Sequence, residues 1–263
     1  MTVDPRPVRL FVAGDLAAGT AVALSADQGH YLRNVMRRGA GDPIHLFNGR
    51  DGEWRATLAE IGKRDAAAIA EERVREQQPE SDLWLVFALI KRKRVEDIVE
   101  KATELGVARL LPAITRRTVV PRINTDRLYA RAVEAAEQCG RLTVPDIDEA
   151  RSLEALLADW PADRRLLWCD ESGGGAPIAH ALAGLADGTG SGPWAVMTGP
   201  EGGYAPEELD AVRKLPFVTA VGLGRRVLRA DTAAIAALAC VQATIGDWRC
   251  GQAAPDDSNK QPR

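Results

Sequence analysis

Two short segments in the last third of the chain each combine glycines with charged residues. The first is Gly199-Pro200-Glu201-Gly202-Gly203, and the second runs from Leu223 to Ala234. Each follows a short apolar run and precedes a helical pattern, as connections between a strand and a helix do. Open α/β sheets bind ligands at the carboxyl ends of their strands. We therefore expect one ligand site, built by both segments at the ends of neighbouring strands.

From residue 83 onward, apolar runs alternate with helical patterns. Strands are expected at 83–90, 109–114, 166–169, 194–198 and 218–222, and helices at about 94–105, 126–139, 177–185, 206–214 and 231–248. Within the first helix, Val95, Ile98 and Val99 begin an apolar stripe, and Gly106 is the expected stop. This alternation is typical of a mostly parallel sheet with helices on both faces.

The first part of the chain follows a different pattern. Its apolar runs are short, at 8–12, 20–24, 43–47, 54–58 and 67–70, and are separated by turn signals such as Gly41-Asp42 and Asn48-Gly49. This spacing predicts a small β-barrel. We divide the chain into an N-terminal barrel domain at 1–77, an α/β domain at 81–250 and a flexible polar tail at 251–263, with a flexible loop at 188–193.

One helix interrupts the barrel pattern. Ser25 and Gln28 form a capping box at its start. At helical spacing, Leu32, Val35 and Met36 mark a buried face, whereas His30, Arg33 and Arg37 share the outer face. The basic outer face is either a solvated surface or part of a surface for nucleic acid.

Composition limits the class of protein. A net charge of −3 argues against a protein that coats nucleic acid along its whole surface, although arginines and lysines are locally clustered. No apolar run approaches the ~20 residues of a membrane-spanning helix, and the N-terminus lacks a signal-peptide pattern, so we expect a cytoplasmic protein. The cysteines Cys139, Cys169, Cys240 and Cys250 form no CxxC pair, so we expect reduced thiols without zinc or disulfides.

The glycine segments exclude the common nucleotide motifs. Residues 199–203 do not read GxGxxG, and no phosphate-binding lysine follows them, so dinucleotides and nucleoside triphosphates fit poorly. Glycines do let a planar base and a ribose approach the backbone closely, and Glu201 suits a cationic ligand. Two tight turns without a ligand are the alternative. In the last helix, 233–243 is rich in alanine, which indicates either close packing or simply high helix propensity.

Taken together, residues 199–203, 223–224 and 227–233 closely resemble the signature of the RsmE family, the 16S ribosomal RNA uridine N3-methyltransferases of the SPOUT (trefoil-knot) superfamily. Further matching residues are found at 30–33, 101–107, 134–141 and Pro145. The resemblance implies an N-terminal PUA-like RNA-binding β-barrel and a C-terminal α/β domain whose last helix completes a trefoil knot. It also implies a homodimer that binds S-adenosylmethionine and acts on the 30S ribosomal subunit, without a metal.

Site residues follow from the same resemblance. Cofactor contacts are implied for Thr198, Gly199, Glu201, Gly202, Leu223, Gly224, Val227 and Leu228. Arg229 would face the methyl group and the target base, near Glu201. The chain departs from the family pattern where Ala230 replaces threonine, Asp231 replaces glutamate and Cys139 replaces serine; Asp231 is then expected to act only as a helix N-cap.

Uridine N3 carries a proton and is a poor nucleophile until that proton leaves. Arg229 is expected to stabilise negative charge on the uracil oxygens, and either Glu201 or a water to take the proton. The positioning of the two reactants is expected to contribute most of the acceleration. RNA contacts are predicted from His30, Arg33, Arg37, Lys91, Arg92, Lys93, Arg94, Arg116, Arg117, Gln138 and Arg141.

Two other functions are compatible with the sequence. One is a knotted methyltransferase that acts on another RNA site, such as a site in tRNA. The other is a non-catalytic RNA-binding factor in ribosome assembly. For a 16S rRNA methyltransferase, the sequence leaves both naked 16S rRNA and the assembled 30S subunit open as substrates.

Overall fold

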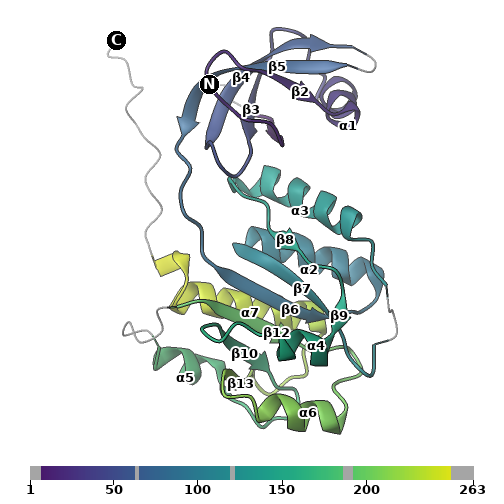
Figure 1. Ribbon diagram of the computed structural model, residues 1–263, viewed down its shortest axis with the longest axis vertical. Coiled ribbons are helices and arrows are strands. Elements are labelled where there is room, and N and C mark those ends of the chain that lie inside the picture. The colour runs from purple at the N-terminus through teal and green to yellow at the C-terminus, as the bar shows by residue number, and fades with distance from the viewer. Residues whose placement is uncertain (1–6, 63–64, 119–121, 186–191, 250–263) are drawn as a thin grey trace. The chain divides into compact units, whose positions relative to one another are not determined.

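The computed structural model describes residues 7–62, 65–118, 122–185 and 192–249. These residues form two compact units, drawn in Figure 1. The first unit combines the described part of 1–80 with 126–146, and the second combines 81–125 with the described part of 147–263. Residues 188–191 of the expected loop, Cys250 and the expected tail lie outside the described residues.

The first unit contains a five-stranded sheet. Its strands lie in the order β1 (Arg9–Phe11), β3 (Pro43–Phe47), β4 (Glu53–Ile61), β5 (Ala66–Arg75) and β2 (Ala21–Leu24). All pairings are antiparallel except the parallel pair of β1 and β3. Apolar side chains from all five strands share one core. The five strands predicted from the short apolar runs are thus confirmed.

The predicted helix is present but changes form after one turn. Helix α1 (Ala26–His30) begins with the predicted capping box, in which the backbone N–H of Gln28 donates to Ser25 Oγ. The chain then continues as a π-helix at Tyr31–Val35. The predicted buried face is therefore wrong at two positions: Leu32 is buried, but Val35 and Met36 are 62% and 36% exposed. Because a π-turn bonds residue i to i+5, side chains three and four positions after Leu32 leave the face that an α-helix would give them.

Helix α3 (Thr125–Cys139) belongs to the first unit although it follows two strands of the second. The Arg9 guanidinium on β1 donates to the carbonyls of Ala136 and Glu137, both at 2.9 Å. In turn, the Glu137 carboxylate accepts the backbone N–H of Phe11 at 2.9 Å. These bonds satisfy carbonyls that the helix end leaves without partners. They anchor α3 to the edge of the five-stranded sheet.

The second unit is built on a parallel sheet, which confirms the predicted α/β class. Its order is β11 (Ala176–Pro177), β13 (Val218–Gly222), β10 (Arg165–Cys169), β12 (Trp194–Thr198), β6 (Leu83–Ala88), β7 (Val107–Ile114) and β8 (Asp146–Ile147), with β9 (Arg151–Ser152) also paired to β7. The pairings from β11 to β7, and that of β7 with β9, are parallel. The three two-residue strands were not predicted because they are too short to give an apolar run.

Five helices of the second unit connect or flank the strands. They are α2 (Arg92–Glu104), α4 (Leu153–Ala158), α5 (Ile178–Ala183), α6 (Pro206–Arg213) and α7 (Ala230–Thr244). Side chains of α4 and α6 share a core with the sheet, whereas α7 packs against α2 and α5. Helix α4 was not predicted, since six residues show little periodicity. Among the described residues, no helix has both the length and the apolar character needed to cross a bilayer.

The end of α7 differs from the prediction. The helix stops at Thr244, and a short 3-10 turn follows at Asp247–Arg249. The buried side chain of Gln242 explains the stop: its Nε2 donates to Leu105 O at 2.6 Å, and its Oε1 accepts the N–H of Asp247 at 3.1 Å. Leu105 ends α2, and Gly106 follows with φ 78°, as expected for a helix stop. The side chain thus joins the end of α2 to the end of α7.

Candidate functional site

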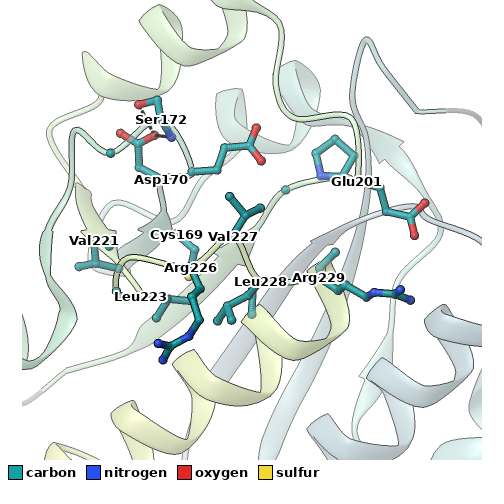
Figure 2. A pocket seen from close by; sticks show the side chains of 18 of the residues that line it. Cys169, Asp170, Ser172, Glu201, Val221, Leu223, Arg226, Val227, Leu228 and Arg229 are labelled. Carbon is teal, nitrogen blue, oxygen red and sulfur yellow. Dashed lines mark hydrogen bonds between the residues drawn. The ribbon is translucent and has the colours of Figure 1, made fainter.

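A cavity of about 560 Å³ opens at the carboxyl ends of three strands of the parallel sheet. It is lined by loops at 169–173 after β10, 199–201 after β12 and 221–229 after β13, together with Arg94 and the first turn of α7. Figure 2 shows this cavity. Its volume lies within the range of about 300–1,000 Å³ that is typical of small-molecule sites.

The structure brings the two glycine segments together at this cavity, but their strands are not neighbours. Strand β10 lies between β12 and β13 and pairs with both. The predicted adjacency is therefore wrong, and the loop after β10 supplies a third wall. Its sequence, Asp170-Glu171-Ser172 before three glycines, directly follows an apolar run. Glycines and charged residues directly after an apolar run also identified the other two segments. The loop after β10 was nevertheless not predicted to be part of the site.

The loop after β10 places negative charge at the cavity wall. Asp170 is 4% exposed and accepts bonds from the N–H of Ser172 at 2.9 Å, from Ser172 Oγ at 2.6 Å and from Arg213 at 3.1 Å. Burial alone would raise the pKa of Asp170, but these hydrogen bonds lower it overall. The carboxylate therefore stays ionised at neutral pH. Arg213 compensates the charge of Asp170, so the negative charge offered to a ligand at this wall is that of Glu171, which lines the cavity and has no ion-pair partner among the described residues.

Other parts of the wall are apolar. Figure 2 shows Val221, Leu223, Val227 and Leu228 around the cavity, and Val227 is 91% exposed. Burial raises the pKa of the Cys169 thiol to about 12, so this residue is a neutral, weakly polar part of the wall. The apolar wall and the nearby carboxylate together suit a ligand with a planar apolar group and a positive charge.

The segment 199–203 requires glycine at its two ends. A Cβ on Gly199 would lie 2.7 Å from the ring of the buried Tyr204, and Gly203 has φ 68° with Glu171 against it. Glu171 also accepts the N–H of Tyr204 at 3.2 Å. Of the residues assigned to the cofactor from sequence, Thr198 and Gly202 do not line the cavity, and Thr198 is buried. Gly202 instead exposes its carbonyl, which accepts a bond from Arg117 at 2.9 Å.

Glu201 and Arg229 both border the cavity, as expected, but they do not form an ion pair with each other. The Glu201 carboxylate is bonded to the Arg94 guanidinium in the first turn of α2. Arg229 is exposed at the N-cap position of α7, and its side chain has no bonded partner among the described residues. Figure 2 shows both side chains on the same side of the cavity. Arg229 is therefore an unpaired cation at the edge of the site.

The first turn of α7 also corrects the role expected for Asp231. Because Arg229 occupies the N-cap position, Asp231 lies inside the helix, and its Oδ1 has no hydrogen-bond partner. A carboxylate in the first turn is stabilised by the helix dipole. Ala230 is buried. Where the family pattern has a threonine hydroxyl, this chain therefore has a small apolar side chain at the start of α7.

The basic residues predicted to bind RNA lie in both units. In the second unit, Lys91, Arg92 and Lys93 are exposed at the start of α2, and Arg92 pairs with Glu96 at 3.3 Å. Arg116 pairs with Glu207 at 3.3 Å. Arg94 and Arg117 instead hold the 199–203 segment, as described above. No group of three or more possible metal ligands occurs in the described part of the chain.

In the first unit, His30 ends α1, Arg33 lies in the π-turn and Arg37 follows it, and Gln138 is exposed near the end of α3. Arg141 differs from these residues. Its side chain is 9% exposed and pairs with Glu80 at 2.5 Å. This position suits a structural contact within the unit, and we do not retain Arg141 as an RNA contact.

Comparisons with known proteins cover both units. A family model described as an RNA methyltransferase domain matches residues 76–242, and a model described as an RNA methyltransferase PUA domain matches residues 24–71. Ribosomal RNA small subunit methyltransferase E of Rickettsia conorii is 30% identical over 235 residues, which are 89% of this chain and 94% of that protein.

Solved structures show the same similarity. A methyltransferase of Legionella pneumophila, solved with bound S-adenosylmethionine, has a TM-score of 0.81 at 28% identity, with 92% of this chain and 99% of that chain covered. Ribosomal RNA small subunit methyltransferase E of Neisseria gonorrhoeae, bound to S-adenosylmethionine, has a TM-score of 0.77 at 28% identity, with coverages of 90% and 96%.

Proposed function

The chain belongs to the ribosomal RNA small subunit methyltransferase E family, and we propose that it methylates N3 of a uridine in the 16S rRNA of the 30S subunit, with S-adenosylmethionine as methyl donor. The observation that supports this most is the cavity at 169–173, 199–201 and 221–229, where carboxylates, an apolar wall and an unpaired arginine meet. We place the protein in the cytoplasm, where ribosomes are assembled.

The residues of the cavity fit this cofactor. Glu171, a carboxylate at the cavity wall without an ion-pair partner among the described residues, suits the positive charges of the ligand, while Asp170 is held by Ser172 and Arg213 and shapes the loop. Val221, Leu223 and Leu228 suit its adenine, and Gly199 and Gly224 leave room for its ribose beside the backbone. When bound, S-adenosylmethionine supplies a methyl group that is already activated by the sulfonium. The protein therefore has to bring the uracil to the methyl and favour its deprotonated form.

We assign to Arg229 the task of favouring the deprotonated form of the uracil. Its unpaired guanidinium at the edge of the cavity stabilises the negative charge that develops on the uracil oxygens as N3 loses its proton. Glu201 is held by Arg94, so we assign it to shaping the loop after β12 and assign proton uptake to a water. Holding both reactants in line supplies up to about 7–11 kcal/mol of the barrier reduction, which exceeds the contribution expected of a general base.

RNA reaches the site through basic residues of both units, in our proposal. The second unit, which contains the cavity, contributes the exposed residues Lys91, Arg92, Lys93 and Arg116. The first unit, which contains the PUA domain, contributes His30, Arg33, Arg37 and Gln138. The trefoil knot and the homodimer of the family stay predictions for this chain.

The test is methyl transfer from labelled S-adenosylmethionine to purified 30S subunits from a strain that lacks the enzyme, followed by digestion and identification of the methylated nucleoside. We expect label in 3-methyluridine of 16S rRNA. Label in another nucleoside, or in tRNA alone, would assign the enzyme to a different RNA site. Cofactor binding without any transfer would instead favour a non-catalytic assembly factor.

A further inference from the structure

One surface of the first unit contains Arg33 and Arg37, which the proposed function assigns to RNA binding, and it also carries two exposed apolar side chains. It consists of Val35 and Met36, which the π-turn leaves exposed, and the neighbouring arginines Arg33, Arg37 and Arg38. We call it the Met36 patch. Arg37 has φ 54°, the one positive value of a residue other than glycine in the described chain.

The backbone that forms the Met36 patch is unfavourable by itself. Val35 is 62% exposed and Met36 is 36% exposed, so both side chains forgo part of the burial that stabilises apolar groups. A non-glycine residue at positive φ adds backbone strain. Single π-turns are rare and are frequently found at functional sites. The exposed apolar pair is therefore maintained against two costs, which indicates a contact with another molecule.

Charge at the Met36 patch identifies the kind of molecule. Five other arginines in the described part of residues 7–80 are ion-paired: Arg9 and Arg75 with Glu53, Arg50 with Asp15, Arg55 with Glu71 and Glu72, and Arg73 with Glu76. Arg33, Arg37 and Arg38 have no carboxylate partner among the described residues, and Arg33 donates only to the Gly62 carbonyl. Three arginines without a carboxylate partner therefore lie within three residues of Val35 or Met36 in the sequence.

We propose that the Met36 patch binds an unpaired nucleotide of the RNA substrate, an inference that rests on the proposed function. The base stacks on Met36 and Val35, and Arg37 and Arg38 meet the flanking phosphates. Proteins read unpaired bases by stacking them on apolar or aromatic side chains and hold the backbone with cations. In a duplex the bases are stacked on each other and are not available to such a surface.

The test compares one RNA sequence as a single strand and as a duplex, bound to the full-length protein and followed by fluorescence anisotropy at several salt concentrations. Met36→Ser should weaken single-strand binding about fivefold or more, because base stacking contributes roughly 1–3 kcal/mol per base. Duplex binding and the salt dependence should stay unchanged. Arg37→Gln should instead reduce the salt slope for the single strand by about 0.7.

Val74→Ser is the matched control. Val74 is 38% exposed, like Met36 at 36%, and lies in the same unit. Ala66, at the other end of β5, lies beside Gly29 of α1. Val74 is eight positions further along the strand, which is roughly 26 Å from Ala66 at the rise of a strand. Its substitution should leave RNA binding unchanged. Melting curves of both variants should match the unsubstituted protein, since both side chains are exposed.

Three results would overturn the proposal: equal effects of Met36→Ser and Val74→Ser, equal weakening of single-strand and duplex binding by Met36→Ser, or unchanged single-strand binding. If Met36→Ser weakened 30S association but not single-strand binding, the patch would be a protein-binding surface instead. Methyl transfer to 30S subunits by the unsubstituted protein is measured in parallel. If the unsubstituted protein transfers no methyl group, the proposed function is contradicted. If it does transfer the methyl group but Met36→Ser binds the single strand as tightly as the unsubstituted protein, only the role of the Met36 patch is contradicted.

Discussion

The carboxylate of Glu201 is bonded to the guanidinium of Arg94, so the loop after β12 is tied to the first turn of α2 and not to Arg229. Arg94 and Glu201 compensate each other and fix the loop, whereas Arg229 keeps its charge for a bound partner. The expected roles of Arg94 and Glu201 change as a result, whereas that of Arg229 does not.

Arg94→Met should weaken cofactor binding by about two- to fivefold. The pair is partly exposed, with side chains 25% and 36% accessible, so it contributes no more than about 1 kcal/mol. Titration calorimetry with S-adenosylmethionine measures the effect. Arg92→Met is the control, because Arg92 pairs with Glu96 on the helix and does not line the cavity. Equal affinities for the two variants would contradict the role given to Arg94.

Arg229→Ala should lower kcat by about 10²–10³-fold while cofactor affinity changes little. A group that stabilises charge developing in the transition state has an effect of this size. Single-turnover methyl transfer to 30S subunits and calorimetry separate the two quantities. Arg249→Ala, a change of the same charge outside the cavity, should leave both unchanged. A kcat within a factor of three or so of the unsubstituted enzyme would contradict this assignment.

Gly203→Ala should destabilise the second unit more than Gly202→Ala. Gly203 has φ 68° and Glu171 lies against it, so a Cβ would be strained and would displace that carboxylate. A Cβ on Gly202 would meet only the Arg117 Cβ, at an ordinary 3.9 Å. We expect a loss of unfolding free energy of roughly 1–3 kcal/mol for Gly203→Ala. Thermal denaturation of the two variants checks this, and equal melting temperatures would refute it.

Glu53 makes the first unit sensitive to acid. This carboxylate is 4% accessible and pairs with Arg9, His45 and Arg75. Burial would raise its pKa, but hydrogen bonds from His45 and Arg9 lower it to about 2 from the ordinary 4.5. A depressed carboxyl pKa gives stability that is complete above pH 4.5 and is lost as the pH falls towards 2.

Glu53→Gln should therefore cost about 3 kcal/mol of unfolding free energy at pH 7, because it leaves the largely buried Arg9 and the half-exposed Arg75 without their charge partner. The cost should shrink as the pH falls from 4.5 towards 2. Urea denaturation at pH 7 and pH 3 measures both. Glu76→Gln, which removes the partner of Arg73 at a position 77% exposed, should cost less than about 0.5 kcal/mol at either pH. A cost for Glu53→Gln that is independent of pH would contradict the assignment.

Periodicity and turn signals predicted the ten longer strands and placed α2, α3 and α6 within two residues of their observed bounds. They did not predict the order of strands. The position of β10 between β12 and β13 depends on pairing across residues distant in sequence, so the loop at Asp170 was missed. Likewise, α-helical spacing predicted that Val35 is buried, because the residue types at 31–35 do not distinguish a π-helix from an α-helix. The partner of Glu201 follows from tertiary packing alone.

The central claim is that the loops at 169–173, 199–201 and 221–229 form a single cofactor site. A second cavity of the same volume, about 560 Å³, lies between α4 and α6 and is lined by residues such as Leu153 and Val212. Amide hydrogen exchange with and without S-adenosylmethionine distinguishes the two directly. Our account predicts that the cofactor slows exchange in all three loops together and leaves 152–158 and 207–215 unchanged. Protection at the second cavity, or in only one of the three loops, would contradict it.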